Sequence, residues 1–216
     1  MDKETLKKDM EQFYSSSHNY LNQLKSHSIK GYQKYLDKIL ALVAKKSKIL
    51  DIGCGTGQVA NFLAEKDYEV IGIDLSSIFV KEAKKGKAKF KVMDSTSLKF
   101  KDNSFDAVIS AETLEHIPNP EKALLEMTRV LKKDGLIFLR FPNKQSTLNN
   151  FSTLLLKKPL FQLKNPNLSQ GVWGEDEDLC YLASTADVLV FLKNQGFKIL
   201  YTKPFFWRAG FVIAKK

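Results

Sequence analysis

Residues 48–57 read KILDIGCGTG, and this stretch decides the fold. A short apolar strand comes first, and three glycines at alternate positions then lead into a helix that starts at Gln58. Glycine permits positive φ and lets a ligand lie against the backbone, and the start of a helix offers unpaired N–H groups. Open parallel sheets bind ligands at the carboxyl ends of their strands, so this loop predicts a ligand site.

The rest of the chain indicates a doubly wound α/β fold around this loop. We expect further strands at 69–73, 88–93, 105–110, 136–139, 197–202 and 207–214, and helices at 58–66, 76–85, 120–132 and 185–194. Several of these strands are almost continuously apolar and are separated by helices. That pattern is typical of a parallel sheet covered on both faces.

The chain of 216 residues fits one domain with four segments, and its charge follows them. These are N-terminal helices over 1–45 (broken at Ser15–Ser17 and Gly31), a core over 46–142, a polar insertion over 143–180, and a closing helix and strand pair over 181–216. The net charge of +10 is absent from residues 49–143, whereas residues 1–48 and 144–216 carry +5 each. The core is therefore neutral, and the basic excess lies on its flanks.

The glycine loop differs from two common phosphate-binding loops. A dinucleotide fingerprint needs a small residue where Gln58 stands, and a P-loop needs a Gly-Lys-Ser/Thr sequence that is absent. Asp51, two residues before Gly53, would repel a pyrophosphate and attract a cation. The loop therefore favours a ligand that carries positive charge and no phosphate.

Two more acids stand where the next two strands end. Asp74 follows 17 residues after Gly57, where a carboxylate can bind both hydroxyls of a ribose, and Asp94 ends the third predicted strand beside Ser95. Each acid alone is explained by helix capping. The three together, at successive strand ends, favour a binding site.

At this point the sequence resembles a family. ILDIGCGTG at 49–57, IGIDLS at 71–76 and FDAVIS at 105–110 look like the successive motifs of class I S-adenosylmethionine-dependent methyltransferases. LEHI at 114–117 and EMTRVLKKDG at 126–135 extend the resemblance toward the small-molecule, ubiquinone-biosynthesis-like branch. The resemblance implies a Rossmann-like, seven-stranded, mostly parallel sheet with the last strand antiparallel and with N-terminal helices.

The resemblance also implies S-adenosylmethionine as the cofactor and roles for particular residues. Gly53, Gly55 and Gly57 would contact its methionine part, with Asp51 near its amino group. Asp74 would hold the ribose hydroxyls, Asp94 and Ser95 would face the adenine, and Ala111 would line the methyl-donor pocket. The cofactor-binding set implied in this way is Asp51, Gly53, Cys54, Gly55, Gly57, Asp74, Leu75, Asp94, Ser95 and Ala111. Tyr14, Tyr20 and Tyr32 are candidates to cover the cofactor, although core packing explains each of them as well.

Methyl transfer needs alignment and exclusion of water, and it needs a base only if the acceptor must lose a proton. Glu112, Glu115 and His116 follow the fourth predicted strand, and His116 and Glu112 are the candidate catalytic groups. A role of the Glu115-His116 pair in fixing the loop is the alternative. We expect no metal site, because ligand-spaced His and Cys motifs are missing. A cysteine nucleophile is not expected either.

Three functions remain open at this stage. The first is transfer of a methyl group to a small-molecule acceptor that is anionic, aromatic or lipid-like, with the insertion over 143–180 as a lid. The second is methylation of RNA, such as tRNA, or of protein through the basic flanks. The small number of arginines and the lack of a series of aromatic residues for base stacking speak against nucleic acid. The third is a cofactor-binding scaffold without catalysis.

Partners and compartment follow from composition. No apolar run approaches the ~20 residues of a membrane span, and residues 1–9 lack an apolar signal-peptide segment. Two cysteines form no disulfide framework, so the cytoplasm is expected. A basic, partly apolar insertion is also compatible with peripheral contact to a membrane surface.

Overall fold

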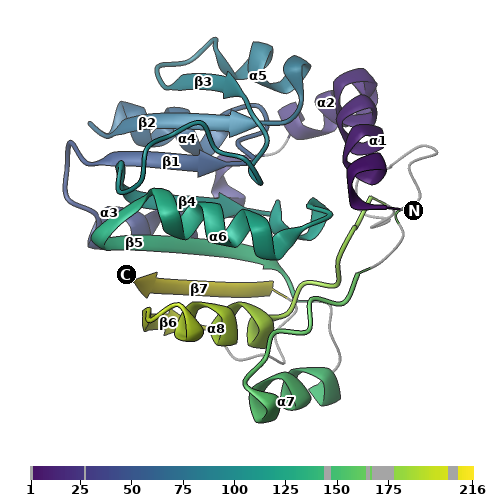
Figure 1. The fold of residues 1–216 in the computed structure, drawn as a ribbon. Helices are drawn as coiled ribbons and strands as arrows, with labels where there is room; N and C mark the ends of the chain where they lie inside the picture. Colours follow the sequence, from purple (N-terminus) through teal and green to yellow (C-terminus); the bar gives the residue numbers. More distant parts are fainter. Residues whose placement is uncertain (1, 27, 144–146, 164–165, 167–177, 204–208) are drawn as a thin grey trace.

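The computed structural model describes residues 2–26, 28–143, 147–163, 166, 178–203 and 209–216. One sheet of seven strands runs through the molecule in the order β3-β2-β1-β4-β5-β7-β6 (Figure 1). The strands are β1 (Lys48–Ile52), β2 (Glu69–Asp74), β3 (Lys89–Val92), β4 (Phe105–Ala111), β5 (Leu131–Pro142), β6 (Lys198–Thr202) and β7 (Ala209–Lys215). β1 to β5 are parallel, and β7 pairs antiparallel with β5 and β6. The predicted doubly wound sheet with an antiparallel last strand is confirmed.

Helices cover both faces of this sheet. The helices that follow strands are α4 (Gln58–Glu65), α5 (Ser77–Ala83), α6 (Pro120–Val130) and α8 (Thr185–Asn194). One core cluster packs α6 and α8 against the sheet, and the other packs α4, α5 and α3 (Gln33–Leu42) against the opposite face. β1 and β4, in the middle of the sheet, have no exposed residue. Burial on both faces explains why their sequences are nearly all apolar.

Local sequence signals set where these helices begin. The side chains of Ser76, Asn119 and Ser184 accept backbone N–H hydrogen bonds at the starts of α5, α6 and α8. Pro120 occupies the first turn of α6, where its missing N–H costs no helical hydrogen bond. Capping therefore fixes these helix starts within a residue or two of the predicted ones.

The end of α6 is where the sequence interpretation was wrong. We expected a helix to residue 132 and a strand over 136–139, but α6 ends at Val130 and β5 already begins at Leu131. Leu131 pairs with Phe105 of β4, and a register shift separates this pair from the regular ladder that starts at Ala107. Residues 131 and 132 therefore belong to a strand, although their sequence is compatible with a helix. The turn signal of Asp134 and Gly135 made the strand appear to begin later than it does.

The amino-terminal segment forms α1 (Lys3–Ser16), α2 (His18–Ser26) and the 3-10 turn η1 (Ile29–Tyr32) before α3. The predicted breaks near Ser17 and Gly31 are confirmed. Figure 1 shows α1 and α2 beyond the carboxyl ends of β1, β2 and β4. The Ser76 hydroxyl donates a hydrogen bond to the Tyr14 carbonyl (2.8 Å), which ties α1 to the start of α5. The leading helices therefore face the edge of the sheet where the ligand site was expected.

The insertion over 143–180 contains one helix in its described part, α7 (Thr147–Leu156), which packs on α8. No described residue of 143–180 lines the pocket at the carboxyl edge of the sheet. The structure therefore does not support a lid formed by α7, although part of the insertion, with Trp173, lies outside the described residues. Among the residues that the structure describes, no helix is long and apolar enough to cross a membrane.

Candidate functional site

The glycine loop after β1 is held by backbone hydrogen bonds to β2. The N–H groups of Gly53 and Cys54 both donate to the Ile73 carbonyl at 2.9 Å, and the N–H of Gly55 donates to the Asp74 carboxylate at 2.9 Å. Gly53, Gly55 and Gly57 all have positive φ, between 51° and 79°. Side chains other than glycine rarely adopt this conformation, so the loop can close against β2 only with glycines at these positions.

The three glycines have different neighbours. A Cβ on Gly53 would lie 2.1 Å from Thr113 Cγ2, so the loop and the segment after β4 touch there. A Cβ on Gly55 would meet only Leu24 at 3.7 Å, which leaves room beside the backbone. Gly57 faces Ala83 and Phe90 instead and does not line the pocket. The structure thus brings Gly53 and Gly55 to the site, while Gly57 serves the packing of α4 against α5 and β3.

Of the three acids, Asp51 is the one without a partner among the described residues. It is 4% exposed, lines the pocket, and receives no hydrogen bond and no cationic partner from the described residues. Burial, together with the charge of Asp74, raises its pKa to about 8. A buried carboxylate without a partner is unfavourable, and a cation placed beside it would remove this cost.

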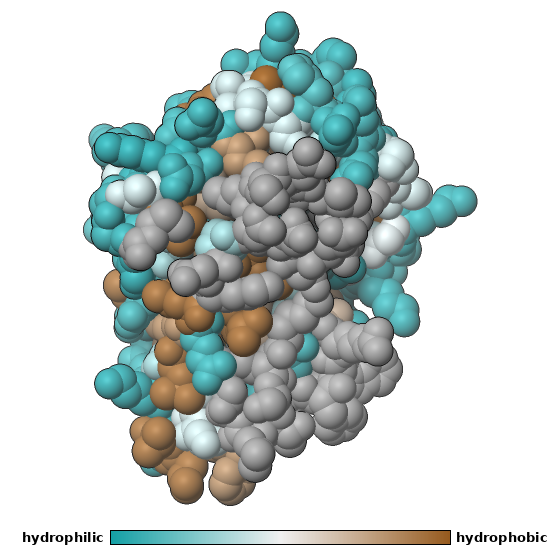
Figure 2. Space-filling view, turned by 90° about the vertical axis from the view of Figure 1, so that its right-hand side faces the viewer, coloured by the Kyte–Doolittle hydropathy of each residue, from teal (hydrophilic) through white to brown (hydrophobic). Residues whose placement is uncertain are grey.

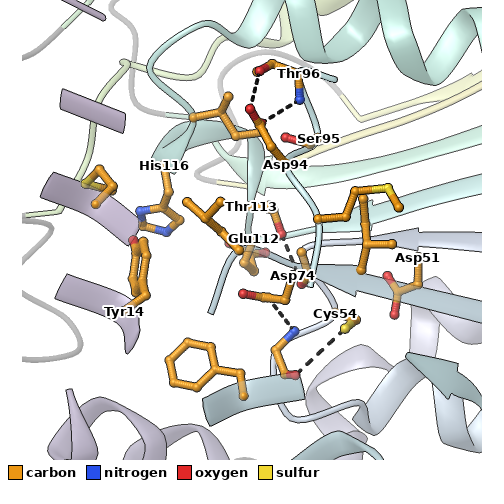
Figure 3. A pocket seen from close by; sticks show the side chains of 18 of the residues that line it. Tyr14, Asp51, Cys54, Asp74, Asp94, Ser95, Thr96, Glu112, Thr113 and His116 are labelled. Atoms are coloured by element: carbon orange, nitrogen blue, oxygen red, sulfur yellow. Dashed lines mark hydrogen bonds between the residues drawn. The ribbon is translucent and has the colours of Figure 1, made fainter. Parts of the chain in front are cut away.

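Asp74 lies at the end of β2 and is positioned by the backbone. Its two carboxylate oxygens accept hydrogen bonds from the N–H groups of Gly55 and Ser76, both at 2.9 Å. Burial nevertheless raises the pKa of Asp74. Figure 3 shows Asp74 and Cys54 on opposite sides of the glycine loop. Cys54 lines the pocket, but burial raises the pKa of its thiol, so it is not an activated nucleophile.

Asp94 follows β3 and is the third acid that lines the pocket, after Asp51 and Asp74. The backbone N–H and hydroxyl of Thr96 donate to its two oxygens, each at 2.8 Å, and Lys7 of α1 lies 3.3 Å from it. Ser95 and Leu75 also line the pocket. The acids predicted from three separate strands therefore surround one cavity, together with Cys54 and Ala111.

Aromatic side chains from the leading helices and from α5 form another wall of the pocket. Tyr14, Tyr20 and Phe79 meet as one cluster, with the rings of Tyr20 and Phe79 stacked at 5.9 Å between centroids. All three line the pocket, and Tyr32 lines it as well. The two interpretations of these tyrosines are thus both met, because the rings pack together and also cover the cavity.

Beyond β4 the charges are paired with each other. Glu112 adopts φ 52° and places its carboxylate 3.2 Å from the Arg140 guanidinium, which also lies over the Tyr32 ring at 4.9 Å. A positive φ in a residue other than glycine is strained and is found mostly where the surroundings enforce it. Glu112 and Ala111 line the pocket. Glu112 thus reaches the site already paired with Arg140.

His116 belongs to a network that also contains a residue not identified from sequence, Asp178. Nδ1 of His116 lies 3.3 Å from both the carbonyl and the carboxylate of Asp178, and the Tyr14 hydroxyl donates to that carboxylate at 2.7 Å. Figure 3 shows the ring of Tyr14 beside that of His116. Asp178 lies 62 residues after His116, and the acidic run at 175–178 gave no sign of which carboxylate would reach the site.

The Glu115 carboxylate lies next to His116 but does not line the pocket. It is 2% exposed, one oxygen has no hydrogen-bond partner, and the other lies 3.7 Å from His116 Nε2. Burial opposes a charged imidazole, but the charges of Glu115 and Asp178 outweigh it and raise the pKa of His116. The protonated imidazole is therefore favoured more than in a free histidine, and the general-base role of His116 stays a prediction.

The arrangement thus has an acidic side with an unpartnered carboxylate and an aromatic wall. Such a pocket suits a flat ring system and a positive charge, and it disfavours a phosphate. Among the described residues, no group of three or more His, Cys, Asp or Glu side chains is placed to hold a metal ion.

Comparison with known proteins agrees with this geometry. A family model described as a methyltransferase domain matches residues 50–139. The chain is 31% identical to demethylmenaquinone methyltransferase of Thermotoga maritima, over 81% of this chain and 80% of that protein. It is 38% identical to chloroplastic tocopherol O-methyltransferase of Arabidopsis thaliana over 104 residues, which are 44% of this chain and 30% of that protein. A solved S-adenosylmethionine-dependent methyltransferase from Methanosarcina mazei superposes with a TM-score of 0.63 at 26% identity, covering 83% of this chain and 96% of that one.

The fold and the pocket define an α/β protein that binds a positively charged, nucleoside-type cofactor at the carboxyl edge of its sheet. With the relatives above, the chain belongs to the class I S-adenosylmethionine-dependent methyltransferases, in the small-molecule branch. Its cofactor is S-adenosylmethionine. The chain spans less than a third of the tocopherol relative.

Proposed function

We propose that this protein transfers a methyl group from S-adenosylmethionine to an ionised oxygen of a small, otherwise apolar acceptor. The observation that carries the cofactor part of the proposal is Asp51, a buried carboxylate that faces the pocket without a partner among the described residues. The acceptor part rests on His116, which lines the same pocket, and on the names of the relatives. The bound cofactor supplies a methyl group activated on a positively charged sulfur. All residues 1–216 act, in this proposal, as one methyltransferase domain.

On the cofactor side, each residue has a role that its contacts support. Asp51 offers its negative charge to the cofactor's amino group, and Gly53 and Gly55 leave the backbone open to its methionine part. Asp74, held by two backbone N–H groups, presents its remaining lone pairs to the ribose hydroxyls. Asp94 and Ser95 face the adenine, while Leu75 and Cys54 line the pocket between them.

On the acceptor side, we infer that His116 binds the acceptor as a cation. The charges of Glu115 and Asp178 raise its pKa and so favour the charged imidazole, which would attract an acceptor oxygen that is already negative. Thr113, Ala111 and Glu112, which is paired with Arg140 behind it, complete that part of the lining. The protein then aligns donor and acceptor and keeps water out, as such a displacement requires.

The names of the relatives support an apolar acceptor of this kind. One is named for demethylmenaquinone and another for tocopherol. The pocket is rich in carboxylates, which repel phosphates, so its lining does not favour RNA or tRNA as the acceptor. Neither of these relatives is named for a protein acceptor. The cytoplasm is the compartment we propose, since Cys54 and Cys180 are both free thiols.

The test is an acceptor screen that measures release of S-adenosylhomocysteine. We expect release with hydroquinones or phenols that ionise near neutral pH, and none with transfer RNA or unrelated proteins. Calorimetry with S-adenosylmethionine runs in parallel, with Asp74→Ala as the control. Absence of cofactor binding by the unmodified protein would overturn the proposal, and release with RNA alone would replace the acceptor class.

A further inference from the structure

Helix α7 is oriented with its polar side chains toward the protein. Asn150 and Thr153 are 1% and 0% exposed. The Ser184 hydroxyl donates to the Asn150 side chain, and the Thr153 hydroxyl donates to the Asp187 carboxylate at 3.1 Å. Helices on the surface of globular proteins normally turn their apolar side inward. The inner side of α7 is polar instead.

The outer side of α7 is apolar and exposed. Phe151, Leu155 and Leu156 are 64%, 70% and 63% exposed, and Leu160 and Leu163 continue the exposed set after the helix. Among the residues that the structure describes, the other large apolar side chains that are exposed lie singly on four different elements: Leu42, Val92, Leu125 and Leu200. Single exposed apolar residues are common, whereas a gathered set marks an interaction surface. Figure 2 shows brown atoms gathered in the lower part of the molecule, where Figure 1 places α7.

Asp187 fixes this orientation. Its carboxylate is buried and also accepts hydrogen bonds from the backbone N–H groups of Leu160 (2.8 Å) and Phe161 (3.3 Å), just after α7. Rotation of α7 to bury its leucines would take the Thr153 hydroxyl away from this carboxylate. Burying a charge with fewer partners is costly, so the apolar side is kept outward by the interior of the protein.

The charge of this part of the sequence has one sign. Residues 143–174 contain no Asp or Glu and four lysines, of which the structure describes Lys157 and Lys158. Lys157 and Lys158 follow directly after Leu156 and are exposed. An apolar strip beside lysines, without acids, matches an anionic lipid surface, where the apolar side chains enter the boundary layer and the lysines meet the head groups.

We propose that the outer side of α7, formed by Phe151, Leu155 and Leu156 with Lys157 and Lys158, docks the protein on an anionic lipid surface. A second copy of the chain fits the same surface less well, because a two-fold interface places each patch against itself and would bring the lysines together. The strip is also short for a stable dimer, which needs about 800 Å² on each partner. Docking goes beyond the proposed function, although it would place the enzyme where an apolar acceptor dissolves.

The experiment is flotation of the full chain with lipid vesicles. We expect binding to vesicles of equal parts phosphatidylglycerol and phosphatidylcholine, and at least about tenfold weaker binding to phosphatidylcholine alone. The triple variant Phe151→Ser, Leu155→Ser, Leu156→Ser should lose at least about tenfold in the partition coefficient. The matched control Leu42→Ser, Leu125→Ser, Leu200→Ser, also three exposed leucines, should bind like the unmodified protein. Lys157→Gln with Lys158→Gln should weaken binding only to the anionic vesicles.

Cofactor affinity, measured by calorimetry on each variant, shows that the folded site is intact and keeps this test separate from the proposed function. The docking proposal is overturned if the unmodified protein stays with the aqueous fraction, or if the α7 triple variant floats as well as the control. A dimer in sedimentation that the same triple variant dissociates would assign the surface to a second copy instead.

Discussion

On the side of the pocket formed by β1, β2 and β3, Asp51 lies buried with no protein partner in the described part of the chain. On the side formed by β4 and the turn after it, the ionised groups lie beside one another, Glu112 with Arg140 and His116 with Asp178. The first side is incomplete without a ligand, and the second is complete in itself.

This difference shows which part of the site depends on the ligand's charge. The cofactor side carries an electrostatic cost that a cation removes, so binding there should respond strongly to loss of one carboxylate. On the acceptor side each of the two cations, Arg140 and His116, already lies beside an acid of the protein, so single changes there should act mainly on turnover.

Asp74→Ala should have the largest effect. It removes a pocket carboxylate and leaves the N–H groups of Gly55 and Ser76 without their acceptor. We expect the cofactor's dissociation constant to rise by about 100- to 1,000-fold, or about 3–4 kcal/mol, measured by calorimetry.

Asp106→Ala is the matched control for that change. Asp106 also accepts a backbone N–H, from Lys48, and an ion pair, from Lys132, but it does not line the pocket. Its variant should lose stability while cofactor affinity stays within about twofold. Equal losses of affinity in both variants would show that Asp74 acts through the fold and not through the ligand.

Gly53→Ala should come next, because the two sides of the pocket touch at this glycine. The new Cβ would lie 2.1 Å from Thr113 at a φ of +69°, so strain and crowding add. We expect a loss of about 2–4 kcal/mol in the free energy of unfolding, measured by urea denaturation. Gly196→Ala has a similar φ of +81° with nothing within 4 Å, and should lose only about 1 kcal/mol. Equal losses would mean that the contact with Thr113 is unimportant.

His116→Gln should lower turnover by about tenfold and change cofactor affinity by less than twofold, because the substitution removes a positive charge from the acceptor side alone. The pH profile gives the sign. The pKa of His116 is raised above its ordinary value of 6.5, so turnover should be highest below pH 6.5 and should fall as the pH rises through the raised value. A general base would give the opposite slope, with turnover increasing over this interval.

Asp51→Asn should have the smallest effect on the unliganded protein, in the stabilising direction. Burial raises the pKa of Asp51 to about 8 from 3.8, so the folded state binds more protons than the unfolded state between these values. Stability therefore falls as the pH rises from about 4 to about 8, and the variant removes that slope. At pH 8 we expect the variant to be more stable than the unmodified protein, measured by urea denaturation. A less stable variant would mean that Asp51 has a partner in the unliganded protein.

The same contrast explains what the sequence could predict. Asp51, Asp74 and Asp94 were identified because each stands at the end of a strand in a parallel sheet, and parallel strands bring their carboxyl ends together. Asp178 was missed, because it reaches His116 through a segment without a periodic pattern. Gly57 shares its motif with Gly53 and Gly55, and only the three-dimensional contacts show that it packs against Ala83.

Helix α7 shows a second limit. Its sequence predicts one apolar face, but periodicity does not say whether that face points inward or outward. The direction is decided by Asp187, on a different helix, which binds Thr153 and the backbone after α7. Long-range polar contacts of this kind leave no local signal in the sequence.

The most direct test of the account is the number of protons released when S-adenosylmethionine binds, measured by calorimetry at pH 7 in buffers of different ionisation enthalpy. Because Asp51 has a pKa of about 8 in the unliganded protein and a cation should ionise it, we expect release of roughly one proton per site. That release should disappear in Asp51→Asn, which should also bind the cofactor more weakly. Equal proton release by both proteins would contradict the assignment of Asp51 as the carboxyl group that ionises when the cationic cofactor binds.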